Sequence, residues 1–272
     1  MEALNSILRS LLDALLGVLS GLPDWVVLAI LAFLVTLLIL PVIKWTFNLD
    51  LAEHFKRRVY AGLFEIRLFN DKLGATLRGL VDVLRFTGGY MGAWLLPLVV
   101  MSIPMLPIFA HLQFQYGYDG IEPGETTLVR AEFAQDRETG KPETRFVAPK
   151  GLRVDTPALW VPAKRELIWR VAAEAKGDYE LNLEIDGETF TKSLTVSDES
   201  ARRSPVRTAK SFWNQLIYPA EPPLPGGSPL TQITVDYGEK GSFLFVPNWC
   251  WILIALSLPP FLLLKKRFGV EV

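Results

Sequence analysis

Chemically reactive side chains are scarce in this sequence. Its 272 residues include one cysteine, Cys250, and two histidines, His54 and His111. A single cysteine excludes a disulfide framework and a cysteine-based zinc site, and two histidines leave few groups for metal or acid–base chemistry. The sequence offers no histidine or other general base in a pattern that would activate a serine as a nucleophile. No glycine pair lies in a phosphate-loop motif. We therefore predict that the protein is not an enzyme and uses neither a cofactor nor a metal.

An excess of charge of either sign is also missing. The 28 Lys and Arg residues against 29 Asp and Glu residues give a net charge of −1, which argues against nucleic acid as a partner. Half of the residues are hydrophobic, yet 21% are charged, so the two kinds must be segregated along the chain. This composition excludes a disordered chain and indicates a membrane protein with a polar domain.

Three long stretches contain no Lys, Arg, Asp or Glu. They are residues 25–43, 91–112 and 243–264. Each is long enough to cross a hydrocarbon core of about 30 Å as a helix. We therefore predict three transmembrane helices, with the lipid bilayer as the first partner of the chain.

The distribution of basic residues predicts the orientation of these spans. Residues 44–90 contain eight Lys or Arg residues, whereas the first 24 residues contain only Arg9. The positive-inside rule then places the N-terminus outside, and residues 44–90 and the C-terminal tail in the cytoplasm, in the cell inner membrane. Residues 113–242 are expected in the periplasm or outside the cell. The run Lys265, Lys266 and Arg267 is interpreted as an orientation signal and a membrane anchor that contacts anionic lipid.

Residues 1–22 have leucines at helical spacing, with Asn5, Arg9 and Asp13 on the opposite side. A signal peptide is the competing interpretation, but Glu2 and Asp13 and the lack of a basic start argue against it. We predict an amphipathic helix on the outer membrane surface. The membrane core then begins at residue 23 and its first part runs to residue 112.

Residues 48–87 have helical periodicity that is broken near Asn70-Asp71 and Gly74, which predicts a helical hairpin. Charges of both signs are interspersed along it. The hairpin is therefore either a solvated helix pair along the membrane or a mobile element that meets an incoming hydrophobic chain. Gly88 and Gly89 are predicted to form a flexible joint before the second span.

Prolines interrupt the second span at Pro97, Pro104 and Pro107. Each proline removes a helical hydrogen bond and kinks the helix. One interpretation is that proline is simply common in membrane spans. The other is an irregular three-helix bundle with a hydrated opening toward the cytoplasm. Lys44 and Arg85, at the cytoplasmic ends of the first two spans, would then line a client groove.

The sequence from residue 113 to residue 200 changes to an alternating pattern. Tyr179 to Ile185 alternates apolar and polar residues, and Asp186-Gly187 signals a tight turn before a partner strand at residues 188–196. With strands expected at 127–133, 152–154 and 166–172, the pattern predicts a small exported β-sandwich. Residues 201–242 are expected to form a Pro-rich connector, with a short helix near 211–218 and a strand near 231–237. The third span and the tail occupy residues 243–272.

Lys176-Gly177-Asp178-Tyr179 resembles the Gly-Asp-Tyr entry to a late strand of immunoglobulin-like domains. In those domains the tyrosine hydroxyl caps a corner. The expected fold is therefore an α-helical membrane protein with an exported, all-β, immunoglobulin-like sandwich.

The order of the membrane segments resembles the YidC/Oxa/Alb insertase superfamily. The resemblance is to its three-span branch, which includes the archaeal YidC-like proteins and the insertase-type subunit of the ER membrane protein complex. Gly88-Gly89, the Leu-Pro pair at Pro97 and the Pro-Ile-Phe run at 107–109 are similar to the family's motifs. Two features differ: the first span lacks the family's arginine, with only Lys44 nearby, and the β-domain lies between the second and third spans.

The resemblance implies a groove, open to cytoplasm and lipid, that eases polar chain into the bilayer. Two functions are left open. The first is an insertase-like or membrane-chaperone module that acts on hydrophobic client polypeptides. The second is a membrane-anchored scaffold whose β-sandwich docks an envelope partner or a membrane-complex partner.

Overall fold

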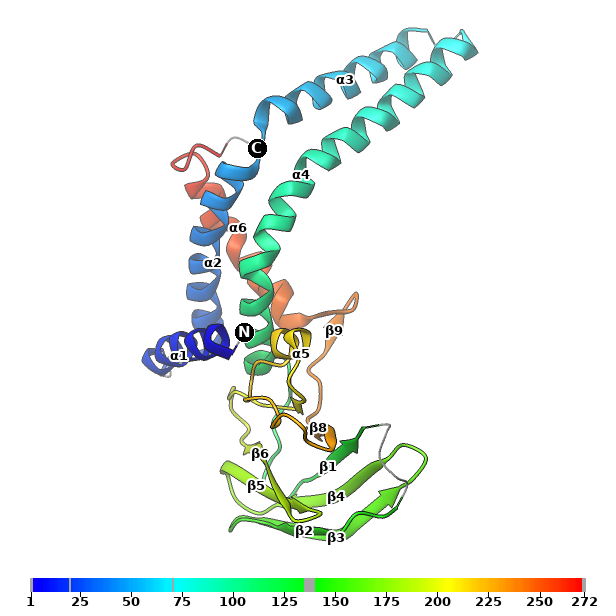
Figure 1. The fold of residues 1–272 in the computed structure, drawn as a ribbon. Helices are drawn as coiled ribbons and strands as arrows, with labels where there is room; N and C mark the ends of the chain where they lie inside the picture. The colour runs from blue at the N-terminus through cyan, green and yellow to red at the C-terminus, as the bar shows by residue number, and fades with distance from the viewer. Residues whose placement is uncertain (1, 20, 70, 135–139, 271–272) are drawn as a thin grey trace. The chain divides into compact units, whose positions relative to one another are not determined.

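The computed structural model describes residues 2–19, 21–69, 71–134 and 140–270. The chain forms two compact units, each described by itself below. The first contains Met1–Val27 and Leu106–Ile252 and includes the β-strands of the sandwich (Figure 1). The second contains Leu28–Met105 and Leu253–Val272 and is helical. The predicted combination of a helical part with a separate β-domain is confirmed.

Two helices in the described part of the chain are long and apolar enough to cross a membrane. They are α2 (Asp24–Thr46) and α4 (Leu73–Tyr116). The third apolar run gives only the 17-residue helix α6 (Asn248–Leu264). Before it, β9 (Ser242–Phe243) and β10 (Val246–Pro247) pair as a short antiparallel hairpin. The prediction of three full-length spans is corrected to two, because proline disfavours helix at the preceding residue and delays the start of α6.

The predicted helical hairpin is present. Helix α3 (Leu49–Leu68) begins at its N-cap Asn48, whose Oδ1 accepts the Leu51 N–H at 3.0 Å, and the chain turns back into α4 after residue 72. Helix α4 runs from Leu73 to Tyr116 without a break, so Gly88 and Gly89 lie inside a helix, and the flexible joint there stays a prediction. Figure 1 shows this helix as one continuous element. It also continues through Pro97, Pro104 and Pro107, since each proline removes one hydrogen bond while the neighbouring turns keep theirs.

Glycines mark where α3 and α4 touch. A Cβ atom at Gly62 would lie 2.8 Å from Val83 Cγ2 and 3.2 Å from the Gly79 carbonyl oxygen. A Cβ atom at Gly89 would lie 2.6 Å from the Phe55 ring. The role of Gly89 is therefore close packing between the two helices, at a position that the sequence suggested as a joint.

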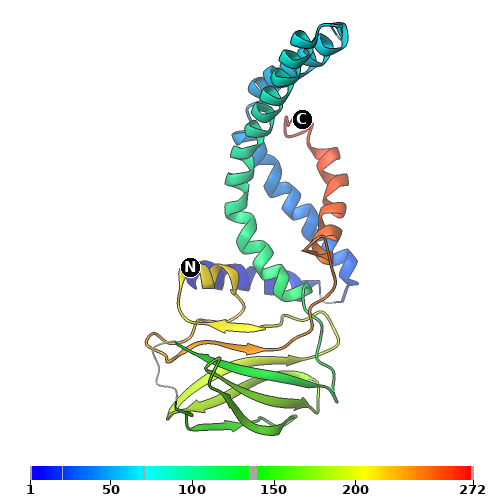
Figure 2. The ribbon, with the colours of Figure 1, turned by 90° about the vertical axis from the view of Figure 1, so that its right-hand side faces the viewer.

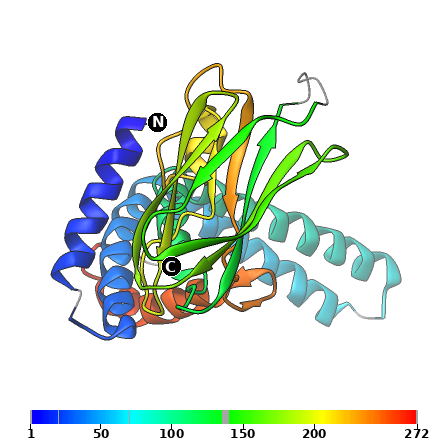
Figure 3. The same ribbon diagram turned by 90° about the horizontal axis from the view of Figure 1, so that it is seen from below.

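The β-sandwich contains a five-stranded sheet in the order β3-β4-β1-β8-β7 and a three-stranded sheet in the order β2-β5-β6 (Figure 2). The strands are β1 (Thr126–Phe133), β2 (Thr144–Val147), β3 (Leu152–Val161), β4 (Glu166–Ala173), β5 (Gly177–Ile185), β6 (Glu188–Val196), β7 (Val206–Thr208) and β8 (Leu230–Val235). Alternate residues such as Val129, Leu181 and Ile233 are fully buried in the core. Figure 3 shows the sandwich from below, with strands of the two sheets overlapping in the view. The predicted strands agree with β1, β4, β5 and β6, β3 is longer than predicted, and β2 was not predicted.

Residues 201–242 belong to the sandwich. Strand β8 pairs with β1, and β7 pairs with β8, so this segment completes the larger sheet. Leu224 and Leu230 are buried in the core. The strand predicted near 231–237 is found as β8, whereas β7 was not predicted, and the segment expected to be a connector contributes both strands to the larger sheet. The predicted short helix is found as α5 (Phe212–Ile217).

Two local predictions for the sandwich are confirmed. Asp186 and Gly187 have φ angles of 50° and 83°, the left-handed pair that joins β5 to β6 in a tight hairpin. The Tyr179 hydroxyl donates to the Ala175 carbonyl at 2.8 Å. This contact is the tyrosine corner that the Gly-Asp-Tyr motif predicts.

Replacing Tyr179 by Phe is expected to lower the stability of the sandwich by about 1 kcal/mol, because only this hydrogen bond is lost. Urea unfolding followed by tryptophan fluorescence measures the change. Tyr60→Phe is the matched control, since Tyr60 is 53% exposed on α3. An unchanged midpoint for Tyr179→Phe contradicts a stabilising corner.

Candidate functional site

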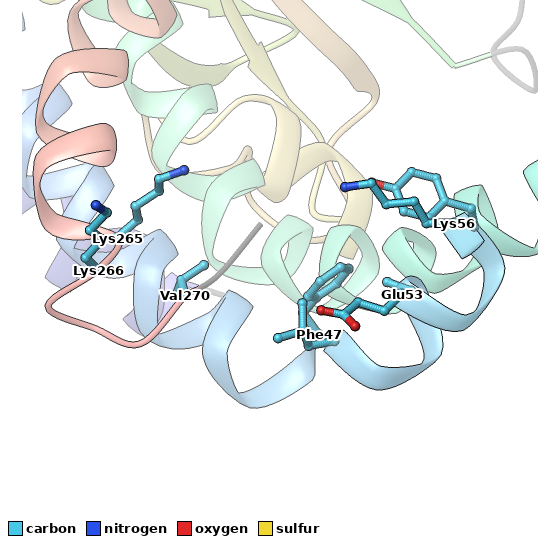
Figure 4. A pocket seen from close by; sticks show the side chains of 9 residues that line it. Phe47, Glu53, Lys56, Lys265, Lys266 and Val270 are labelled. Carbon is cyan, nitrogen blue, oxygen red and sulfur yellow. The ribbon is translucent and has the colours of Figure 1, made fainter. Parts of the chain in front are cut away.

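A pocket of about 550 Å³ lies in the helical unit (Figure 4). Helices α3, α4 and the segments that follow α2 and α6 supply its walls. The lining residues of this lysine pocket are Phe47, Leu49, Ala52, Glu53, Lys56, Tyr90, Lys265, Lys266 and Val270.

The chain after α6 folds back to form one wall. Gly269 adopts a φ of 68°, and the Val270 N–H donates to the Lys265 carbonyl at 2.9 Å, an arrangement typical of a glycine C-cap. Val270 is 4% exposed and packs with Leu40 and Ile43 of α2. The apolar contact of Val270 therefore fixes the course of the basic tail.

This fold-back divides the predicted membrane anchor. Lys265, which is half-buried, and Lys266, which is exposed, line the pocket, whereas Arg267 is exposed and does not line it. Lys56 of α3 and Lys265 extend toward each other from opposite sides (Figure 4). The two predicted anchor lysines thus share a pocket with a third lysine that the sequence analysis did not single out.

The pocket is positive and partly apolar. Its carboxylate, Glu53, already pairs with Arg57 at 2.9 Å, so the three lysines are not balanced by a free acid among the lining residues. The Phe47 ring packs 4.2 Å from the Trp94 ring, centroid to centroid. The arrangement can therefore accept an anionic group attached to an apolar chain.

The structure places the other predicted residues apart from this pocket. Lys44 and Arg85 are exposed, and neither lines it. Helical periodicity gave no signal for Lys56 or Tyr90, because it does not say which face of a charged helix meets the C-terminal tail. A role for Lys44 and Arg85 stays a prediction.

His111 is buried at a helical turn of α4. It is 2% exposed, and its Nδ1 lies 2.8 Å from the Pro107 carbonyl oxygen. Across the described ranges, no group of three or more His, Cys, Asp or Glu residues could hold a metal ion.

A second polar cluster lies inside the sandwich. Lys192 is 1% exposed, and its ammonium group donates to both carboxylate oxygens of Glu221 at 3.1 Å and to the Ser204 carbonyl at 2.5 Å. Burial lowers the pKa of Lys192 to about 8, although Glu221 opposes this shift. The ammonium group of Lys192 therefore holds the 221 loop against β6 through its contacts with Glu221 and Ser204.

Comparison of the chain with protein-family models, with curated proteins and with solved structures finds no significant match.

Proposed function

We propose that this chain is a membrane protein that helps hydrophobic protein segments enter the bilayer, as an insertase-like module or membrane chaperone. Helices α2 and α4 have the length and composition of spans. Helix α6, with 17 residues, would be about 25 Å long, which is short of a hydrocarbon core of about 30 Å, so it is not proposed as a full span. In this topology the N-terminus and the sandwich lie outside, and the lysine pocket faces the cytoplasm.

The exposed apolar surface of the arm carries this proposal; the arm is α3 together with residues 73–90 of α4. Phe64 is 67% exposed, Leu68 73% and Leu73 75%. Tyr60, Leu63, Leu77, Leu80, Val81 and Leu84 are exposed as well. A group of exposed apolar side chains such as this one, when it lies in water, marks an interaction site.

The charges of the arm decide what this surface meets. The cost of placing a charge in hydrocarbon is several kcal/mol, and Arg57, Arg58 and Arg67 are distributed along α3. These charges therefore keep the arm out of the bilayer core. Outside the core, the apolar side chains of the arm remain available to a hydrophobic polypeptide. The lysine pocket at the base of the arm would neutralise acidic residues that flank such a client.

A photocrosslinking amino acid at Leu68 is expected to capture hydrophobic client segments in cells. Val147 on β2 is the matched control, because it is similarly exposed, at 58%, but lies in the sandwich. Lys56→Gln with Lys265→Gln is expected to lower the crosslinking yield at Leu68 about fivefold, since two partly exposed charges are lost. Lys44→Gln with Arg85→Gln removes the same charge outside the pocket and is expected to have a smaller effect.

Three results of this experiment would contradict the proposal or change its residues. Crosslinks to a folded partner at Val147, with none at Leu68, would favour the scaffold function. A larger loss of crosslinking yield in the Lys44 and Arg85 variant would indicate that the client contacts these two residues, as the sequence predicted, and not the pocket lysines. A wild-type yield in the Lys56 and Lys265 variant would remove the pocket from client binding.

A further inference from the structure

The hairpin of β9 and β10 has a turn whose residues do not match its backbone. Val246 pairs with Phe243, so Leu244 and Phe245 form a two-residue turn. Their φ angles are 51° and 63°. A turn with positive φ at both central residues favours glycine, asparagine or aspartate, and bulky side chains are strained there. The needs of the turn therefore do not account for a leucine and a phenylalanine at these positions.

The large apolar side chains of this hairpin are exposed. Phe245 is 102% exposed, Leu244 66% and Phe243 63%. We call these three residues the apolar tip. Trp251 and Ile252, at the start of α6, are 39% and 46% exposed. Contiguous apolar side chains that face outward mark an interaction surface.

The end of α4 holds the base of the hairpin on both sides. The Lys240 N–H donates to the Gly117 carbonyl at 3.0 Å. The Trp249 indole N–H donates to Gln113 Oε1 at 2.8 Å, and the Trp249 ring packs edge to face with Phe109, at 6.0 Å between centroids. All of these residues belong to the first unit, where the hairpin projects beside the start of α6 (Figure 1). The base of the hairpin therefore has a fixed place beside the last turns of α4.

This place favours lipid as the occupant of the surface. The span expected at residues 91–112 ends next to Gln113, so a hairpin held there lies at the membrane–water interface. Residues 241–264 contain no Lys, Arg, Asp or Glu, whereas a surface that docks a soluble protein has a polar rim. Tryptophan, here Trp249 and Trp251, is enriched at the interface of a bilayer.

The polar groups of the hairpin are also compatible with lipid. The Trp251 indole N–H donates to the Phe243 carbonyl at 3.0 Å. The Asn248 N–H donates to the Gly241 carbonyl at 3.1 Å. Backbone groups without partners are costly in a bilayer, and a two-residue turn leaves few of them for headgroups and interfacial water to satisfy.

We propose that the apolar tip inserts into the bilayer leaflet at which α4 ends and thereby fixes the depth of the first unit at the membrane surface. Leu244 and Phe245 reach the outer part of the acyl chains. Their transfer out of water is favourable and offsets the strain of the turn. This inference rests on the membrane location in the proposed function, but it does not rest on client binding.

Fluorescence quenching in vesicles tests the position of the tip. The full chain, with Cys250→Ala and one new cysteine that carries an NBD fluorophore, is reconstituted into phosphatidylcholine vesicles. The vesicles contain a lipid with a doxyl quencher either near the headgroup or deep in the acyl chain. A label at Phe245→Cys is expected to be quenched about twofold more by the shallow doxyl group, because interfacial apolar groups lie about 5–10 Å into the acyl boundary.

Two labelled controls accompany this measurement. Leu159→Cys on β3 is the matched control, because Leu159 is 60% exposed in the same unit, and no quenching by doxyl lipid is expected there. Ile103→Cys reports the membrane location of α4 itself, because Ile103 is 70% exposed near the middle of the expected span. The deep doxyl group is expected to quench this label.

Leu244→Asn combined with Phe245→Gly tests the side chains of the tip without removing the hairpin. This pair suits the turn, so the hairpin is expected to form while its apolar insertion is lost. A label at Ser242→Cys is then expected to be quenched by the shallow doxyl group about threefold less than with the natural tip, since interfacial binding scales with buried apolar area.

Each of the remaining outcomes would overturn the inference. A label at residue 245 that aqueous iodide quenches and doxyl lipid does not, with residue 103 quenched by lipid, would leave only the membrane location standing. A blue-shifted label at residue 245 without doxyl quenching would show that a protein or a second copy covers the tip. Equal quenching at residue 242 with either tip would show that Leu244 and Phe245 do not hold the hairpin in lipid. No doxyl quenching at residue 103 would contradict the membrane location and the inference with it.

Discussion

Replacing Lys192 by Met is expected to lower the free energy of unfolding of the β-sandwich by about 3–5 kcal/mol. Lys192 is fully buried and is paired with Glu221, which is itself 11% exposed. Removing one partner leaves the Glu221 carboxylate without its counter-charge inside the domain. Urea unfolding of the full chain, followed by near-UV circular dichroism, measures the loss.

Two further variants test whether the loss of stability comes from the unpaired buried carboxylate or from the substitution of a lysine as such. Lys176→Met removes an exposed lysine that pairs with Asp198 at 2.6 Å, and it is expected to leave the midpoint unchanged. Lys192→Met combined with Glu221→Leu is expected to recover most of the stability, since an apolar pair replaces the ion pair. A double variant as unstable as the single one would contradict this interpretation, as would a stable Lys192→Met protein.

Gly62→Leu is expected to separate α3 from α4 and to cost about 1–3 kcal/mol through overpacking. The first added carbon already lies 2.8 Å from Val83 Cγ2 and 3.2 Å from the Gly79 backbone oxygen. The backbone of α4 cannot yield as a flexible side chain does. Hydrogen exchange of the α3 amides, measured on the full chain, should therefore accelerate.

Gly88→Ala is the matched control for Gly62→Leu. A Cβ atom at Gly88 meets nothing within 4 Å, and alanine favours helix by about 1 kcal/mol over glycine. Exchange along α4 should therefore slow near this position while α3 is unaffected. Fast exchange around residue 88 in both proteins would instead support the joint that the sequence suggested.

Local patterns predicted most strands of the β-sandwich, including β8, but missed the short strands β2 and β7. The alternation of apolar and polar residues in β5 and the Asp186-Gly187 turn each involve only a few neighbouring residues. Both can therefore be recognised from the sequence. Strand β8 depends on pairing with β1, which lies about a hundred residues earlier. The sequence therefore predicted the strand itself but not its place beside β1 in the larger sheet.

The sequence likewise indicated some residues of the lysine pocket but not how they come together. Lys265 and Lys266 stood out as a basic run after an apolar stretch. Their placement beside Lys56 follows from Val270, which packs on Leu40 and Ile43. A contact between segments so far apart in the chain leaves no periodic signal.

The sequence by itself determined the composition of the segments: long apolar helices, a charged hairpin, an amphipathic first helix and an alternating β-domain. Hydropathy and periodicity are properties of neighbouring residues, and they hold wherever the segment is placed. Only the tertiary structure decided that Gly62 and Gly89 are contact points, that the polar side of α1 (Glu2–Val18) faces protein, and which lysines share a pocket. Those features depend on packing between distant segments, where a few ångströms of backbone approach decide which side chains meet.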